Sequence, residues 1–373
     1  MTKRVGIVLS LAFCCLLVLL SKEAMQAARD GISLWWQMVV PALFPFFVGT
    51  TMLQRAGALT AVSRIRASKL FKIPPAGLSV MLISAMSGAP TGARMCALML
   101  EDRAMSRDQA ERFAALCNFS SPMFIIGSLG SGMLKDARAA LPILVGHLLS
   151  SLVMIAALSI FRPLPGPSAR MKRRETKEFS PWRDLTDAIS DGALAMLRIG
   201  GAIVLFIVII ALIDTTVLAK VFALPIFDTL ERAIGFDPKL ARAMFIGSIE
   251  MTNGCRQIAA LSAPLQWRAA LCSATVSAGG LCVLMQSLAF IDLNPFKYLT
   301  LKQVQSVLSG AITFVLFPLL APEAASAMAQ WDPALFEYNA LTGLMLLIAS
   351  TLGLSVVALL LAVGRRALLR HKT

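Results

Sequence analysis

Three charged side chains lie near the middle of two interrupted apolar stretches of the sequence, where a charge requires a physical reason. Arg94 and Arg256 each follow a glycine, Gly92 or Gly254, by two residues in similar surroundings. A charge at the centre of a bilayer costs about 2.5–3.5 kcal/mol on insertion scales, and a guanidinium can bind a carboxylate through two parallel hydrogen bonds. The pair predicts a site for a planar anion. Alternatively, each arginine caps hairpin carbonyls or pairs with an acid.

The third charge, Glu250, is the only acid at the middle of any apolar stretch. It is a candidate for proton or cation coupling, and its alternative role is to neutralise Arg256. Neutral polar residues near four interruptions of the apolar pattern mark a cavity as a set, although each could instead satisfy backbone groups freed at a helix break. They are Asn118, Ser120, Ser121, Thr252, Asn253, Ser277 and Gln286. His147 is interpreted as a helix-packing hydrogen-bond partner rather than as a proton relay.

The composition excludes a soluble globular enzyme. Of the 373 residues, 57% are hydrophobic and 15% are charged, whereas soluble domains have about 45–50% and 25%. The seven cysteines lie in apolar runs without metal-ligand spacing, only two histidines are present, and no phosphate-binding glycine loop occurs. We therefore expect no catalytic residues, no metal and no cofactor. The net charge of +14 is interpreted as a topology signal, and nucleic acid is not an expected partner.

The apolar pattern predicts an all-α polytopic membrane protein with about eight transmembrane helices. The runs that reach the roughly 20 residues of a span are 5–21, 31–53, 113–134, 139–161, 191–213, 267–290, 303–320 and 339–363. Two further stretches, 76–100 and 243–263, are interrupted near their middle, the first by Ser87-Gly88-Ala89-Pro90-Thr91-Gly92. The arm after this interruption is about 12 Å long, too short for a core of about 30 Å. Both stretches are therefore predicted to be re-entrant hairpins.

The positive charges predict the orientation. With this topology, one side of the membrane carries 23 lysines and arginines and the other carries eight, so both termini are placed in the cytoplasm. The first span is interpreted as retained, with a cleaved signal peptide as the alternative. The predicted units are an N-terminal helix (1–29), a first repeat (30–161), a basic cytoplasmic linker (162–190), a second repeat (191–320), and an outer loop with a C-terminal helix and basic tail (321–373).

Each repeat is predicted to contain a span, a hairpin, a discontinuous helix (113–134 or 267–290) and a final span. Asp30–Trp36 aligns with Asp191–Leu197 at a shift of 161, and Thr91–Arg94 with Asn253–Arg256 at a shift of 162. Three crossings per unit give the copies opposite orientations. Inverted repeats with breaks in matching places are typical of secondary transporters whose site lies near the midplane. The alternative is an old duplication in a membrane protein that transports nothing.

Several motifs resemble the YlbJ family of sporulation integral membrane proteins over residues 30–320. They are Leu34-Trp35-Trp36, Pro41–Phe47, Gly88–Arg94, Cys117–Gly127, Glu250–Cys255, Gly279-Gly280-Leu281 and Gln286-Ser287. The resemblance implies a nucleoside-recognition gate domain, organised like concentrative nucleoside transporters. It also implies a bacterial mother-cell-derived membrane around the forespore, across which the protein moves dipicolinic acid toward the spore. The family has Tyr-Pro-Met-Gly where this chain has Ala89-Pro90-Thr91-Gly92, which leaves the fine substrate specificity open.

The leading hypothesis is a transporter for a small anionic aromatic solute such as dipicolinate, and not an enzyme. The alternatives are a membrane scaffold for spore cortex or coat assembly and a nucleoside-type transporter. The substrate-binding candidates are Gly92, Arg94, Glu250, Arg256 and the seven neutral residues above. A homo-oligomer is compatible with the sequence, and so is coupling to H⁺ or Na⁺.

Overall fold

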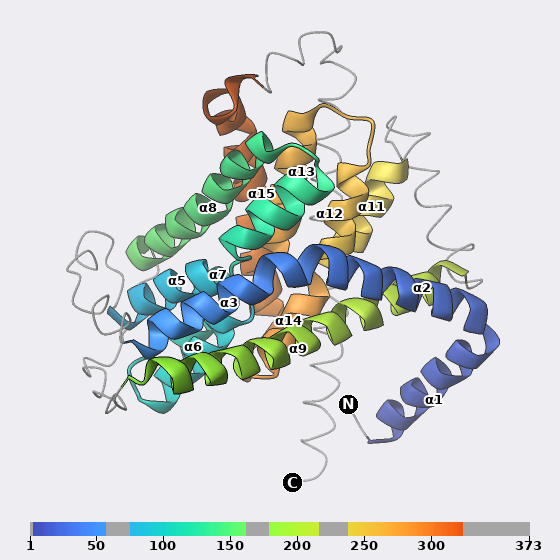
Figure 1. Cartoon of the computed structure of the whole chain (residues 1–373), viewed down its shortest axis with the longest axis horizontal. Helices are drawn as coiled ribbons and strands as arrows, with labels where there is room; N and C mark the ends of the chain where they lie inside the picture. The colour runs from blue at the N-terminus through green and yellow to red at the C-terminus, as the bar shows by residue number, and fades with distance from the viewer. Residues whose placement is uncertain (1–2, 57–74, 162–178, 216–237, 324–373) are drawn as a thin grey trace.

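The computed structural model describes residues 3–56, 75–161, 179–215 and 238–323 (Figure 1). Regular structure in these residues is helical throughout. Five helical segments in this part of the chain are long and apolar enough to cross a membrane: Ser21–Arg55, Ala137–Phe161, Pro181–Thr215, Leu265–Leu288 and Pro295–Leu320. The chain is therefore a helical, multi-pass membrane protein.

These five segments coincide with five of the eight expected spans. The first expected span, 5–21, is α1 (Lys3–Leu19), a helix of 17 residues with mostly exposed side chains. The expected span 113–134 is divided into α7 (Arg107–Leu116) and the π-helix η3 (Phe124–Met133), in agreement with the discontinuous helix predicted there. The expected span 339–363 lies outside the described residues, as do most of the linker 162–190 and of the loop after Ala321.

Two long helices pack against each other in antiparallel orientation (Figure 1). The first is continuous through α2 (Ser21–Leu34), the π-helix η1 (Trp35–Val39) and α3 (Val40–Arg55), and the second is α9 (Pro181–Thr215). Gly31 lies against Val204, and Gly200 lies against the indole of Trp35. At the other end of the pair, Arg55 forms ion pairs of 2.9–3.1 Å with three aspartates at the start of α9, namely Asp184, Asp187 and Asp191. The antiparallel order is the one that an inverted repeat requires of its first elements.

Both interruptions expected in the short apolar stretches are present as breaks between two helices. Hairpin 1 consists of α5 (Pro75–Ser87) and α6 (Thr91–Glu101), and hairpin 2 consists of α11 (Pro238–Ile249) and α12 (Met251–Ala259). At 1.5 Å per residue, α6 is about 16 Å long and α12 about 14 Å, well below the roughly 30 Å of a bilayer core. Neither second arm could cross a membrane alone.

Two discontinuous helices follow the hairpins. Five residues, Cys117–Ser121, lie between α7 and the helical turn that leads into η3, and we call them break 1. A single residue, Gly279, separates α13 (Leu265–Ala278) from α14 (Gly280–Leu288), and we call it break 2. Gly279 and Gly280 have φ of +73° and +72°, a left-handed backbone that glycine adopts without a Cβ clash. The order of elements is thus the same in both halves.

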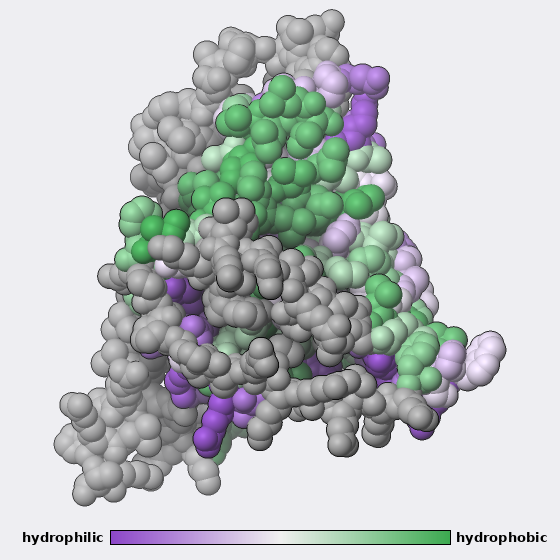
Figure 2. All heavy atoms as spheres, turned by 90° about the vertical axis from the view of Figure 1, so that its left-hand side faces the viewer, coloured by the Kyte–Doolittle hydropathy of each residue, from purple (hydrophilic) through white to green (hydrophobic). Residues whose placement is uncertain are grey.

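The last helices of the two halves, α8 (Ala140–Phe161) and α15 (Pro295–Leu320), also pack in antiparallel orientation, with Gly146 of α8 against Ser309 and Thr313 of α15. A space-filling view shows a broad apolar area, with hydrophilic residues mainly above and below it (Figure 2). This distribution is the one expected of a protein surrounded by lipid at its middle.

One polar end of the molecule includes the start of α8 and the end of α15. Arg138 pairs with Asp136 at 2.6 Å and with Glu323 at 3.8 Å. Hydrogen bonds from the Arg138 guanidinium lower the pKa of Asp136, because they stabilise its ionised form. Asp136 also interacts electrostatically with Arg268, near the start of α13. The start of α13 and the end of the second arm of hairpin 2 therefore lie at this end of the molecule. The open side of hairpin 2 therefore faces this end.

Candidate functional site

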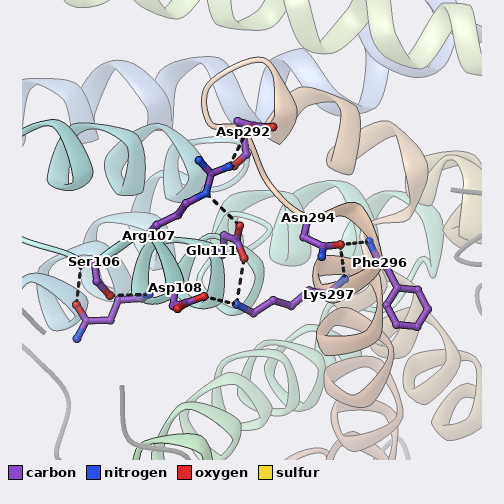
Figure 3. A network of polar contacts seen from close by, with 9 residues as sticks. Ser106, Arg107, Asp108, Glu111, Asp292, Asn294, Phe296 and Lys297 are labelled. Carbon is purple, nitrogen blue, oxygen red and sulfur yellow. Dashed lines mark hydrogen bonds and ion pairs between the residues drawn. The ribbon is translucent and has the colours of Figure 1, made fainter. Parts of the chain in front are cut away.

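A polar network at the opposite end connects the start of α7 with the start of α15 (Figure 3). Arg107 pairs with Asp292 at 2.7 Å and with Glu111 at 3.6 Å, and Lys297 pairs with Glu111 at 3.0 Å and with Asp108 at 3.3 Å. Hairpin 1 leads directly into α7, so its open side faces this end. The two hairpins thus extend toward the middle of the molecule from opposite ends.

Each hairpin tip packs closely on the break in its own half. Gly88 lies against Ser121 of break 1, and a Cβ on Gly92 would lie 2.5 Å from the carbonyl oxygen of Cys117. In the second half, a Cβ on Gly280 would lie 2.9–3.0 Å from the carbonyl oxygens of the last turn of α11. Glycine is required at these contacts because backbone meets backbone. The four irregular segments are consequently brought together.

A cavity lies where the two hairpin tips, break 1 and the first two turns of α14 meet. The space within it is about 590 Å³ when counted out through its open mouth, a figure that includes space open to solvent. Its apolar wall comes from α3, η1 and α9, including Val39, Phe47 and Ile199. Its polar part comes from both hairpins, from break 1 and from α14: Ser87, Ser120, Ser121, Glu250, Thr252 and Gln286.

The N-termini of four short helices, α6, η3, α12 and α14, lie at this cavity, and each carries a partial positive charge. Two of them are capped by side chains of the protein. The Glu250 carboxylate accepts hydrogen bonds from the Thr252 and Asn253 amides at 2.9 and 2.7 Å, and Ser121 Oγ accepts one from the Phe124 amide at 3.1 Å. No side chain caps α6 or α14. The cavity thus has two uncapped helix ends that favour an anion.

Five of the eleven predicted site residues line the cavity: Ser120, Ser121, Glu250, Thr252 and Gln286. Four others are buried behind its wall: Gly92, Asn118, Asn253 and Ser277. Asn118 donates hydrogen bonds to Ser287 and Tyr298 at 2.9 and 3.0 Å, so its amide connects break 1 to α14 and α15. These four support the cavity rather than face it.

The placement of the two arginines corrects the sequence analysis. Arg94 and Arg256 are both exposed and neither lines the cavity. Two residues along a helix correspond to about 200° of rotation, so each arginine points away from the face on which its glycine packs. Arg256 donates a 2.8 Å hydrogen bond to Asn253 Oδ1. Glu250 caps α12 instead of forming an ion pair with Arg256.

His147 of α8 connects the two discontinuous helices. Its Nε2 accepts a 3.1 Å hydrogen bond from the Ser120 amide, and its Nδ1 lies 2.7 Å from Ser277 Oγ. Because Nε2 accepts, the ring hydrogen lies on Nδ1 and is donated to Ser277. These contacts are the helix-packing hydrogen bonds expected of this residue.

Lys302 is a polar residue at the core of the site that the sequence analysis missed, because it was counted among the charges of a cytoplasmic loop. Its side chain is fully buried in α15, and Nζ donates hydrogen bonds to the Asn118 carbonyl and to Gln305 Oε1, both at 3.2 Å. The sequence does indicate that Lys302 lies inside a helix, because Asn294 followed by Pro295 is typical of a helix start. Asn294 does cap α15, which places Lys302 two turns inside the helix.

The paired hairpins, discontinuous helices and shared cavity define a helical integral membrane protein with an internal cavity. The chain is 24% identical over 300 residues to the sporulation integral membrane protein YlbJ of Bacillus subtilis (strain 168), a match that covers 74% of this chain and 72% of that protein. This similarity confirms the resemblance to the YlbJ family. No family model matches the chain, so the expected gate domain is not confirmed, and no solved structure matches it.

Proposed function

We propose that the chain is a sporulation-associated transporter that moves a small anionic aromatic solute, dipicolinic acid, across the mother-cell-derived membrane toward the forespore. In this proposal both termini are cytoplasmic. The sporulation role is supported by the name of the relative, and the transport role by the arrangement of the cavity.

The observation that carries the proposal is the meeting of four helix N-termini at one cavity. Discontinuous helices that direct their N-termini at an anionic group are the usual substrate site of secondary transporters. No side chain caps α6 or α14, so in this proposal the partial positive charge of these helix ends attracts carboxylates. The apolar wall, which includes Val39, Phe47 and Ile199, suits an aromatic ring. A dicarboxylated aromatic solute matches both features.

The arrangement of the hairpins supports movement as well as binding. Their open sides face opposite ends of the molecule, and both tips contact the cavity. Moving one hairpin would expose the cavity to one side, and moving the other would expose it to the opposite side, as alternating access requires. A scaffold protein has no need for this arrangement.

A neutral solute of nucleoside type is the second candidate. In the described part of the chain, no lysine or arginine lines the cavity, and its only carboxylate is Glu250. Serine, threonine and glutamine side chains suit the hydroxyl and amide groups of such a solute. Dipicolinate is preferred because two helix ends have no side-chain cap.

Liposomes with entrapped terbium test the proposal, because terbium luminesces when dipicolinate reaches it. We expect wild-type protein to admit dipicolinate faster than protein-free liposomes do. Ile199→Trp, which fills the cavity from α9, should lose most of this flux. Leu197→Trp is the matched control, since Leu197 is 61% exposed on the same helix, and it should keep the flux.

Labelled uridine in the same liposomes separates the two candidates. Uptake of uridine without uptake of dipicolinate would replace the first candidate by the second. Absence of flux for both solutes, from protein with a cooperative melting transition, would contradict transport and favour the scaffold role.

A further inference from the structure

Lys302 is the buried cation nearest to break 1, and none of its contacts is with an acid. Its side chain has no exposed surface, and its ammonium contacts two neutral oxygens, the Asn118 carbonyl and Gln305 Oε1. Within the described residues, no carboxylate pairs with it. A buried charge is expensive unless its surroundings stabilise it, so the feature requires an explanation.

The ammonium lies beyond the C-terminal end of α7. That end carries a partial negative charge, and two carbonyl groups there accept hydrogen bonds from two different side chains. The Leu116 carbonyl accepts a 2.6 Å hydrogen bond from Ser151 Oγ, and the Asn118 carbonyl accepts one from Lys302. A third neutral oxygen, Asn118 Oδ1, is buried there without a hydrogen-bond partner. Neutral oxygens at the end of a half-helix are the ligands that transporters use for a coupling cation.

We infer that Lys302 is a tethered cation that occupies the cation position of break 1, so that this protein binds and moves its solute without sodium. The Asn118 and Gln305 oxygens would otherwise need a mobile ion to balance the end of α7. A protonated lysine side chain supplies the same charge from within the chain. The sodium requirement is thereby removed by one residue of α15. The statement that the solute moves without sodium rests on the proposed function, whereas the assignment of Lys302 to the cation position does not.

Thermal unfolding of the purified protein in about 100 mM sodium chloride or choline chloride tests the inference without any transport assay. Wild-type protein should unfold at the same temperature in both salts. Lys302→Ser and Lys302→Asn vacate the position, and sodium should then raise the unfolding temperature by roughly 3 °C. Lys297→Ser is the matched control, since Lys297 binds Asp108 and Glu111 at the polar end of the same helix, and it should gain no sodium response.

Two results would overturn the inference. One is sodium stabilisation of the wild-type protein, which needs no variant and would reveal a mobile ion elsewhere. The other is a folded Lys302→Ser or Lys302→Asn protein with no sodium response, which would mean that the oxygens do not form a cation position. Dipicolinate flux should be equal with and without a sodium gradient. Absence of all flux together with the expected melting results would contradict the proposed function and leave the tethered cation supported.

Discussion

The two hairpin tips contact the same cavity but are closed in different ways. In hairpin 2, Glu250 alone separates the helices, and its carboxylate caps α12. In hairpin 1, three residues, Gly88-Ala89-Pro90, separate the helices, and no side chain caps α6. The same backbone feature thus has two electrostatic outcomes. One helix end is neutralised by the protein, and the other is left to a ligand.

The two breaks differ in the opposite way: the helix that follows break 1 has a side-chain cap, and the helix that follows break 2 has none. Break 1 is long and polar, and it is held by Ser121, His147 and Lys302. Break 2 is the single residue Gly279, packed against Val283. Each half therefore has one capped and one uncapped helix end, but at different elements. The two halves share a backbone plan, and their side chains have specialised separately.

The largest effect is expected where backbone packs on backbone in hairpin 2. A Cβ on Gly254 would collide with the backbone of Gly247 and separate α11 from α12. We expect Gly254→Ala to cost roughly 3 kcal/mol of stability. Its counterpart Gly92→Ala should cost less, because one carbonyl of the irregular break 1 can shift. Gly201→Ala, with open space around it, should be neutral in thermal unfolding. Equal unfolding temperatures for all three variants would contradict this packing.

Loss of the cap on α12 should have the next largest effect. Glu250→Ala leaves the Thr252 and Asn253 amides without their acceptor, at a cost of about 1–2 kcal/mol. Glu250→Gln retains one acceptor oxygen and should cost less. Gln257→Ala on the same helix serves as the control. If Glu250→Ala is as stable as wild type but loses flux, Glu250 acts on the solute or a proton rather than as a cap.

A smaller effect is expected at break 1. Ser121→Ala removes the hydrogen bond to the Phe124 amide, at a cost of about 1 kcal/mol. It also uncaps η3 and should tighten dipicolinate binding, because another helix end becomes available to the anion. Equilibrium binding measured by calorimetry checks the direction. Weaker binding in the variant would show that the hydroxyl itself contacts the solute.

The smallest effect is expected at Arg94, which is exposed on the far side of α6. Arg94→Gln should change stability by less than about 0.5 kcal/mol and leave dipicolinate flux near the wild-type rate. Ile199→Trp provides the positive control in the same liposomes. A large loss of flux in Arg94→Gln would mean that the arginine reaches the solute and that the cavity is not the whole site.

The helix breaks could be predicted because their causes are local. Glycine and proline at 88–92 interrupt a helix wherever it lies, and the polar run Glu250-Met251-Thr252-Asn253-Gly254 interrupts the second apolar stretch. The direction in which the Arg94 side chain points depends on which face of α6 packs against the rest of the protein. Because α6 is short, the sequence does not show which face that is. The cavity wall from α3 and α9 depends on packing between distant segments. Lys302 is a different case. Asn294 indicates the start of a helix, but Lys302 was counted among the charges of a cytoplasmic loop, so its position inside that helix was missed.

The bridge formed by His147 has a mechanical consequence. One imidazole bonds break 1 through the Ser120 amide and α13 through Ser277, so displacing either segment alone strands a buried polar group, at about 1–3 kcal/mol. In the proposed transport cycle, the two discontinuous helices are therefore expected to move as one unit. Alternation between the two sides of the membrane would then be carried by the hairpins.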